Sequence, residues 1–287
     1  SVVALCADVA PPTESDLFKN IFPDRFYMTG IAEANTIGLA SGMARMGDIP
    51  FVHSFCVFIT RRAFDQIAMQ IAYPKTNVKL IGFLPGITTA LGVSHQAIDD
   101  IALMRALPNM CVIEPSGPEQ IDSVINEIYK FDGPVYIRQN RANRFYDKNE
   151  LKDFEIGKCY VEKKGKDIAI FSCGLMVDES LKAAKLLNEE GINAYVINVS
   201  TIKPLKDPLI CDIVNECKYF ITAENHSIIG GLGDAVASFL NENKVQYFHS
   251  KVGLNDTFAE GASTSYLMKK YQMNFESIYK TSIDLIK

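Results

Sequence analysis

Apolar runs and helical patterns alternate along most of the chain. In the first half, runs rich in β-branched residues predict buried strands at residues 2–7, 25–29, 49–54, 78–84, 111–114 and 135–138. Segments with a helical spacing of apolar residues lie between them, at residues 32–46, 57–72, 97–106 and 118–130. This alternation is typical of a parallel sheet covered by helices on both faces, so we predict an α/β fold with αβα layers.

The pattern lapses at residues 140–158 into a polar, charged stretch, which we interpret as a linker. A second α/β series follows. Its predicted strands are residues 167–172, 194–199, 219–223 and 246–251, and its predicted helices are residues 177–190, 208–217, 233–241 and a C-terminal pair. We therefore expect two domains, residues 1–150 and 158–287, each with a mostly parallel sheet.

Composition and charge exclude several classes of protein. The 287 residues are 48% hydrophobic and carry a net charge of -5, which provides no basic surface for nucleic acid or an anionic membrane. No apolar run approaches the roughly 20 residues of a membrane span. The seven cysteines are scattered without CxxC spacing, which fits reduced thiols, so we expect a cytoplasmic protein.

Ligands of open parallel sheets bind at the carboxyl ends of the strands, so the strand-to-helix junctions are the first places to look for chemistry. Glu33 lies at one such junction, within GIAEAN at residues 30–35, in the first turn of an apolar helix. A glutamate there can simply complement the helix dipole. A carboxyl at the start of a buried helix is costly, however, unless it has a partner or is protonated. We therefore treat Glu33 as a candidate catalytic residue.

Two further junctions carry aromatic and imidazole side chains. Phe55 and Phe58 are three residues apart in HSFCVF, so they share a face if a helix has begun there. They are either core aromatics or a flat apolar slot for a ring. His95 lies in a loop before a helix, beside Gly92 and Ser94, where it could transfer a proton or bind a hydroxyl.

Together these motifs resemble the C-terminal half of transketolase, in the split form that is made from two chains. GIAEAN, the F-x-x-F of Phe55 and Phe58, SHQAIDDIALMR at 94–105, ENHSIIGGLG at 224–233 and FAEGAS at 258–263 follow the family's order over essentially the whole chain. The resemblance implies a pyrimidine-binding domain followed by the transketolase C-terminal domain.

The resemblance also implies thiamine diphosphate as the cofactor. Glu33 would hydrogen-bond a pyrimidine ring nitrogen and favour the imino tautomer that removes the thiazolium C2 proton. Phe55 and Phe58 would stack on the pyrimidine, and Asp8 and Ile31 would lie near the cofactor at a subunit boundary.

The same resemblance places three residues at the substrate. His95 would contact a hydroxyl or carbonyl and help proton movement, and Arg138, in YIRQN, would hold the anionic end with its paired donors. His53 would add a basic group near the mouth of the site.

A partner chain is implied because no strand-linked GDG…N stretch is present that could hold the diphosphate and a divalent metal. We expect an N-terminal (alpha) transketolase subunit to carry that domain, with Mg²⁺ (or Ca²⁺) held mainly there and no metal ligand in this chain. Because the site needs paired halves, an α2β2 heterotetramer is expected.

Three positions depart from the usual transketolase pattern. Leu91 stands where an acidic residue is usual, Pro12 where a serine is frequent and Phe83 where a histidine is frequent. Arg61 and Arg62 add basic groups, or else they form a solvated helix face. We therefore expect transfer of a two-carbon ketol unit, in carbohydrate metabolism, from a non-standard anionic ketose (a phosphate or a sulfonate) to an aldehyde.

Two other functions stay open. The beta subunit of a 2-oxoacid dehydrogenase E1 shares the GIAE-type glutamate, and AFDQI at 63–67 resembles it, although SHQAIDDIALMR favours transketolase. A non-catalytic regulatory subunit would be favoured by loss of Glu33 or His95, and both are present. Glu224 and His226 match a family motif, but a simple hydrogen-bonded junction explains them equally well.

Overall fold

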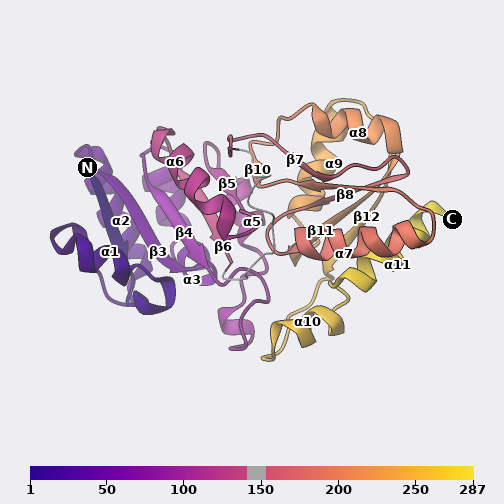
Figure 1. The fold of residues 1–287 in the computed structure, drawn as a ribbon. Helices are drawn as coiled ribbons and strands as arrows, with labels where there is room; N and C mark the ends of the chain where they lie inside the picture. The colour runs from indigo at the N-terminus through magenta and orange to yellow at the C-terminus, as the bar shows by residue number, and fades with distance from the viewer. Residues whose placement is uncertain (141–152) are drawn as a thin grey trace.

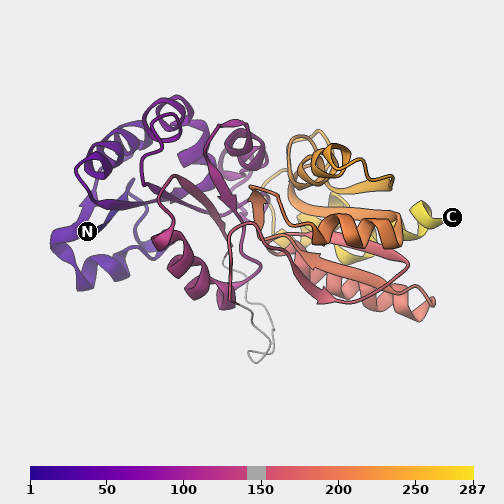
Figure 2. The ribbon, with the colours of Figure 1, turned by 90° about the horizontal axis from the view of Figure 1, so that it is seen from above.

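The chain forms two sheets, each built from one half of the sequence with a single exchange between them (Figure 1). The computed structural model describes residues 1–140 and 153–287. Helices lie on both faces of each sheet, as the view from above shows (Figure 2). The predicted α/β fold is therefore confirmed. The predicted linker falls largely on residues 141–152, which lie outside the described residues.

The first sheet runs through the N-terminal half of the molecule. Its strands are β1 (Val2–Cys6), β2 (Phe26–Met28), β3 (Ile49–Phe55), β4 (Lys79–Phe83), β5 (Cys111–Ile113), β6 (Val135–Gln139) and β10 (Thr201–Lys203). Their order is β10-β5-β6-β4-β3-β1-β2, and all neighbours are parallel except β10 and β5. Every residue of β4 and β5 is buried, as expected for a parallel sheet covered on both faces.

The helices around this sheet agree with the predicted pattern except at residues 16–21, where no helix was predicted, and at residues 57–72. They are α1 (Asp16–Ile21), α2 (Glu33–Arg45), α3 (Cys56–Arg61), α4 (Phe64–Gln66), α5 (Asp100–Ala106) and α6 (Ile121–Lys130). The single helix predicted at residues 57–72 is wrong. The backbone leaves the helical region at Ala63, with φ of -122° and ψ of 18°, and the segment ends as a π-helix (Ile67–Ala72). This break leaves Arg62 at the C-terminal cap of α3.

The second sheet has the order β12-β11-β8-β9-β7. Its strands are β7 (Tyr160–Lys163), β8 (Ile168–Ser172), β9 (Ala194–Asn198), β11 (Tyr219–Ser227) and β12 (Phe248–Leu254). Its helices are α7 (Met176–Glu189), α8 (Leu209–Cys217), α9 (Leu232–Glu242), α10 (Thr264–Lys270) and α11 (Phe275–Ile286). The strand β7 was not predicted, and it is the antiparallel edge strand of this sheet.

The strand β10 joins the two halves, although the sequence pattern did not predict it. It follows β9 along the chain but pairs with β5 of the first sheet. Lys203, at its end, donates a hydrogen bond to the carbonyl oxygen of Arg105 at 2.8 Å. One hydrophobic core runs through both halves, containing Ile113 of the first sheet and Phe171 of the second. The two sheets are thus packed together rather than merely tethered.

A buried arginine, Arg138 at the end of β6, binds groups from both halves of the chain. We call this region, where the two sheets meet, the seam. Its Nε donates to Asp100 at 2.7 Å, its Nη1 donates to Glu114 at 2.8 Å, and its Nη2 donates to the carbonyl oxygens of Ala97 at 3.2 Å and Asn225 at 2.8 Å. Burial alone would raise the pKa of Asp100, but the charge of Arg138, together with His226 and the hydrogen bonds from Arg138 and Tyr136, holds that pKa below its usual value. Each guanidinium nitrogen is engaged within the protein.

Most of the cysteines lie in the interior of the protein. All seven cysteines are free thiols, and six of them are buried. Burial raises the pKa of Cys111 to about 12, which keeps its thiol protonated and unreactive at neutral pH. In the part of the chain that the structure describes, no helix is both long enough and apolar enough to cross a membrane.

Replacing Arg138 is expected to destabilise the fold strongly. Arg138→Met would leave the carboxylates of Asp100 and Glu114 buried without a counter-ion, and breaking a buried pair in this way costs about 3–5 kcal/mol. The free energy of unfolding in urea measures the loss. Lys182→Met removes a solvent-exposed ion pair with Glu179 and serves as the control, with an expected loss below about 1 kcal/mol. Equal losses in the two variants would contradict the role given to Arg138.

Candidate functional site

The first feature of the site is the turn that leads from β2 into α2. Gly30 has a φ of 75°, a left-handed conformation that favours glycine. The Thr29 amide donates to the Cys6 carbonyl oxygen at 3.0 Å, and the Thr29 and Thr36 hydroxyls lie 2.6 Å apart. These bonds fix the turn so that Glu33 becomes the first residue of α2 with only 5% of its surface exposed.

The buried Glu33 carboxylate has a partner, Arg62. The Arg62 Nη1 donates to Glu33 Oε1 at 2.9 Å. The guanidinium carbon of the same arginine lies 3.8 Å from the centroid of the Phe58 ring. Of the two ways in which a buried carboxyl can be stabilised, by a partner or by a proton, the structure shows the partner. Arg62 itself keeps 48% of its side chain exposed.

Phe55, Phe58 and His95 form an aromatic cluster beside this ion pair. The Phe55 and Phe58 ring centroids are 5.7 Å apart, and the His95 ring lies 5.1 Å from Phe58 and 6.2 Å from Phe55. Ser94 Oγ lies 3.0 Å from His95 Nδ1. The structure therefore brings together Glu33, both phenylalanines and the histidine that sequence reasoning had singled out separately.

His53 differs from the basic group that we expected. Its ring stacks 6.3 Å from that of Phe83, across the neighbouring strands β3 and β4. Burial lowers the pKa of His53 to about 4, so the ring is neutral at neutral pH and cannot attract an anion as a charge. Its Nδ1 is enclosed and has no hydrogen-bond partner among the described residues. His53 therefore does not supply the positive charge that we expected of it.

Asp8 and Ile31 lie at the exposed carboxyl edge of the same sheet. Asp8 follows β1 with a φ of 58°, and its side chain is exposed. Ile31, two residues before Glu33, is 75% exposed. Both residues are accessible to a ligand or a partner.

The surroundings of Arg138 do not favour the substrate contact that we expected for it. The side chain is fully buried, and its donors are used by Asp100, Glu114 and two main-chain carbonyls. An anion would have to displace a buried carboxylate to reach it, which the desolvation cost opposes. The sequence identified the residue type but could not show its burial, and we assign Arg138 to the seam.

The pair of adjacent arginines forms two ion pairs rather than a solvated helix face. Arg61 Nε donates to both carboxylate oxygens of Asp99, at 2.9 and 3.0 Å, while Arg62 binds Glu33. Arg61 and Asp99 line a cavity of about 390 Å³, together with Phe258 from the C-terminal half. The sequence indicated Arg62 only as a basic group, and its contact with Glu33 was not predicted.

The motif at Glu224 and His226 forms a hydrogen-bonded junction. Glu224 accepts from the amides of Leu232 and Gly233, at 2.6 and 3.0 Å, at the start of α9. Burial raises the pKa of Glu224 to about 7. The His226 Nδ1 lies 2.7 Å from the Ser227 carbonyl oxygen. These contacts are satisfied within the chain, so the simpler of the two interpretations accounts for the motif.

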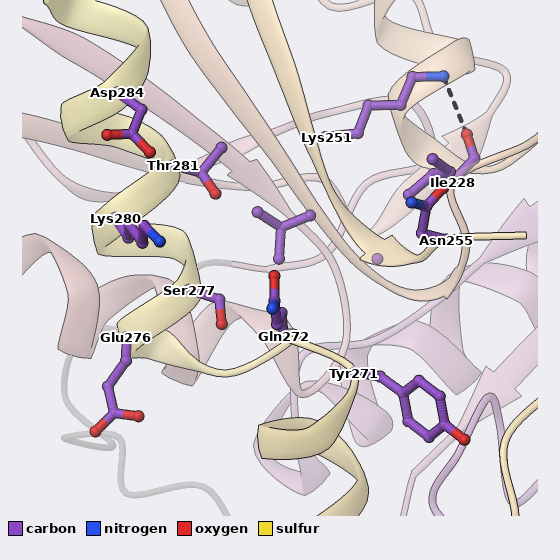
Figure 3. Close-up of a pocket in the computed structure, with 12 residues that line it drawn as sticks. Ile228, Lys251, Asn255, Tyr271, Gln272, Glu276, Ser277, Lys280, Thr281 and Asp284 are labelled. Atoms are coloured by element: carbon purple, nitrogen blue, oxygen red, sulfur yellow. Dashed lines mark hydrogen bonds between the residues drawn. The ribbon is translucent and has the colours of Figure 1, made fainter. Parts of the chain in front are cut away.

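A second cavity, of about 510 Å³, lies in the C-terminal half between β12 and α11 (Figure 3). The amine of Lys251 is turned to the carbonyl oxygen of Ile228 at 3.0 Å and to Asp234. Side chains of opposite charge, Lys280 and Asp284, come from α11. No described group of three or more His, Cys, Asp or Glu residues could hold a metal ion here or elsewhere. The lining gives this cavity no evident chemistry.

Comparison with known proteins covers almost the whole chain. The family model "Transketolase, pyrimidine binding domain" matches residues 1–145, and "Transketolase, C-terminal domain" matches residues 157–278. The chain is 40% identical to a "Putative transketolase C-terminal section" of Methanocaldococcus jannaschii, over 100% of this chain and 91% of that protein.

Two further similarities concern split enzymes. The chain is 39% identical to the "6-deoxy-6-sulfo-D-fructose transketolase subunit SqwH" of Clostridium sp. (strain MSTE9), over 98% of this chain and 87% of that protein. It superposes with a TM-score of 0.90 and 38% identity on a solved structure described as "Split gene transketolase, inactive beta4 tetramer", covering 100% of this chain and 93% of the other.

The burial of His53 predicts a measurable pH dependence of stability. Its pKa is about 4 in the folded chain and near 6.5 otherwise, so below pH 6.5 the unfolded chain binds the extra proton. The free energy of unfolding should fall as the pH drops from 6.5 towards 4. His226 and His249, whose pKa values are also lowered to about 4 by burial, add to the effect. Glu224, whose pKa is raised to about 7 by burial, binds its proton in the folded chain and opposes this effect. His53→Leu should therefore weaken the fall in stability at low pH without abolishing it. Urea unfolding at pH 7 and pH 5 measures it, and an unchanged dependence would contradict the burial of His53.

Proposed function

This chain belongs to the transketolase family, as a beta subunit of the split type with pyrimidine-binding and C-terminal domains, and we propose that it forms one half of a thiamine-diphosphate-dependent transketolase. The proposed reaction moves a two-carbon ketol unit from a ketose donor to an aldehyde acceptor. The observation that carries the proposal is Glu33, a buried carboxylate at a helix start beside the ring face of Phe58. We take the domains to be residues 1–150 and 158–287.

The residues present fit the aminopyrimidine ring of the cofactor. A planar nitrogen group, the Arg62 guanidinium, already stacks on Phe58 and donates an N–H to Glu33. A flat heterocycle with a ring nitrogen could make the same two contacts. When bound, thiamine diphosphate supplies the nucleophilic carbon on which the two-carbon unit is carried.

Each residue of the site has a distinct part in this proposal. Glu33 holds a proton against the pyrimidine ring nitrogen. Phe55 and Phe58 orient the ring by stacking, which contributes about 0.5–1.5 kcal/mol beyond burial. His95, whose ring packs against Phe58, contacts a substrate hydroxyl or carbonyl and moves protons at that atom. His53 offers a neutral hydrogen bond at the mouth of the site.

The other half of the site comes from a second chain in this proposal. An alpha subunit would hold the diphosphate and Mg²⁺ (or Ca²⁺), and two of each chain would assemble as α2β2. Tyr27, Met28 and Ile31, which lie close to Glu33 along the chain, are exposed apolar side chains that a partner would cover, and Leu39 and Met46 are exposed further along α2 and at its end. The similar split-gene protein described as an inactive tetramer of beta chains supports a need for the alpha chain. The free thiols support a cytoplasmic location.

The donor proposed is an anionic ketose with a phosphate or sulfonate end. The Clostridium relative is named for a sulfonated fructose, which supports a donor of this class. Leu91, 62% exposed, and the buried Phe83 stand where polar donor contacts are usual in the family. Because Arg138 is buried, the anion would have to be held by other groups, of this chain or of the partner.

Glu33→Gln should nearly abolish turnover in the assembled complex while leaving the fold intact. The amide keeps the side-chain volume but cannot share a proton with the ring nitrogen, and general acid–base contributions of this kind are about 10²–10⁴-fold. Turnover of ketose donor and aldose acceptor measures the effect, and circular dichroism checks the fold. Glu242→Gln, an exposed position at the end of α9, is the matched control. Undiminished activity of Glu33→Gln would remove Glu33 from the mechanism.

The chain by itself should bind thiamine diphosphate negligibly. It supplies the ring-binding half of the site, whereas most of the charge of the cofactor would be held by the partner. Calorimetric titration with thiamine diphosphate and Mg²⁺ should give no measurable heat for the chain alone and a saturable signal for the complex that co-purifies with it. Tight binding by the isolated chain would contradict the half-site proposal.

A further inference from the structure

The Arg62 guanidinium makes both contacts that a ring at Glu33 would need. Its carbon lies 3.8 Å above the Phe58 centroid, a normal stacking distance, while its Nη1 donates to the Glu33 carboxylate. Phe55 and His95 lie at 5.7 and 5.1 Å from the same Phe58 ring. Two flat groups cannot lie at stacking distance on the same face of one ring, because their van der Waals volumes would overlap.

We propose that Arg62 is a gate, which occupies the cofactor's ring position in the unliganded chain and swings out when thiamine diphosphate binds. This inference rests on the proposed function, because it assumes that the pyrimidine ring stacks on this face of Phe58. When the cofactor binds, the hydrogen bond from the Arg62 guanidinium to Glu33 is replaced by one between the pyrimidine ring and Glu33. Arg62 therefore competes with the cofactor instead of assisting it.

The position of Arg62 in the fold allows such a movement. It follows α3 at the point where the backbone leaves the helical region, and 48% of its side chain is exposed. Its guanidinium can reach solvent without opening the core. Arg61 is held differently, because its Nε donates to both carboxylate oxygens of Asp99. Of the two adjacent arginines, Arg62 makes the fewer ion-pair bonds, a single bond to Glu33, and has the more exposed side chain.

The ion pair with Arg62 also stabilises Glu33 in the chain without cofactor. The Glu33 carboxylate is 5% exposed, and a buried carboxylate without a partner is unfavourable. Arg62 supplies that partner until the cofactor arrives. Removing Arg62 should therefore lower the stability of the folded chain and, at the same time, strengthen cofactor binding. A residue that simply contributed positive charge to the binding of a diphosphate would give weaker binding when removed.

The test compares cofactor affinity in the assembled complex. Arg62→Ala should lower the Kd for thiamine diphosphate, measured by calorimetry with Mg²⁺, by about tenfold, which corresponds to ~1.4 kcal/mol. Arg61→Ala loses the same charge one residue away without freeing Glu33 or Phe58, so it should not bind more tightly. An unchanged or higher Kd in Arg62→Ala would overturn the gate.

A second measurement needs no cofactor. In the isolated chain, Arg62→Ala should lower the free energy of unfolding in the wild-type background but have little effect on it when Glu33→Gln is already present. Additive effects of the two substitutions would show that the pair is not formed, and would overturn the gate even if the complex bound no thiamine diphosphate. Absence of cofactor binding by the wild-type complex, with coupling intact, would instead count against the proposed function.

Discussion

The buried guanidinium of Arg138 is the interaction on which the arrangement of the two halves depends. It neutralises Asp100 and Glu114 and also holds the Asn225 carbonyl of the second sheet. Asp100 begins α5, and the residue before it, Asp99, is bound by Arg61. The same network therefore fixes the loop that carries His95 against the aromatic cluster. A residue that we had expected at the substrate instead positions the elements around the site.

Much of the fold and the core of the site could be predicted because they depend on local pattern and strand direction. Glu33, Phe58 and His95 each follow a strand of one parallel sheet, and the carboxyl ends of such strands meet at one edge. The strand β10 was not predicted, because three residues are too few to show an alternation of apolar and polar positions. Its partner, β5, is also distant in the sequence. The burial of Arg138 depends on partners as far as 87 residues away, which no local pattern shows.

The chemistry of the site follows from one constraint, that a carboxylate removed from water needs a partner. In this chain the partner of Glu33 is Arg62; in the assembled enzyme that we propose, it is the cofactor's ring nitrogen. The comparisons place the chain in the transketolase family, and the ion pair with Arg62 gives the buried Glu33 a partner within the chain itself. In this account, the Arg62 guanidinium of the free chain and the pyrimidine ring of the bound cofactor occupy the same place over Phe58.

A crystal structure of the assembled complex with thiamine diphosphate tests the central claim most directly. The measured quantity is the distance from a Glu33 carboxylate oxygen to the pyrimidine ring nitrogen. We predict a hydrogen-bond distance of about 2.6–3.0 Å, with the ring on Phe58 and the Arg62 guanidinium displaced into solvent. A pyrimidine ring bound elsewhere, with Glu33 still paired to Arg62, would contradict the account.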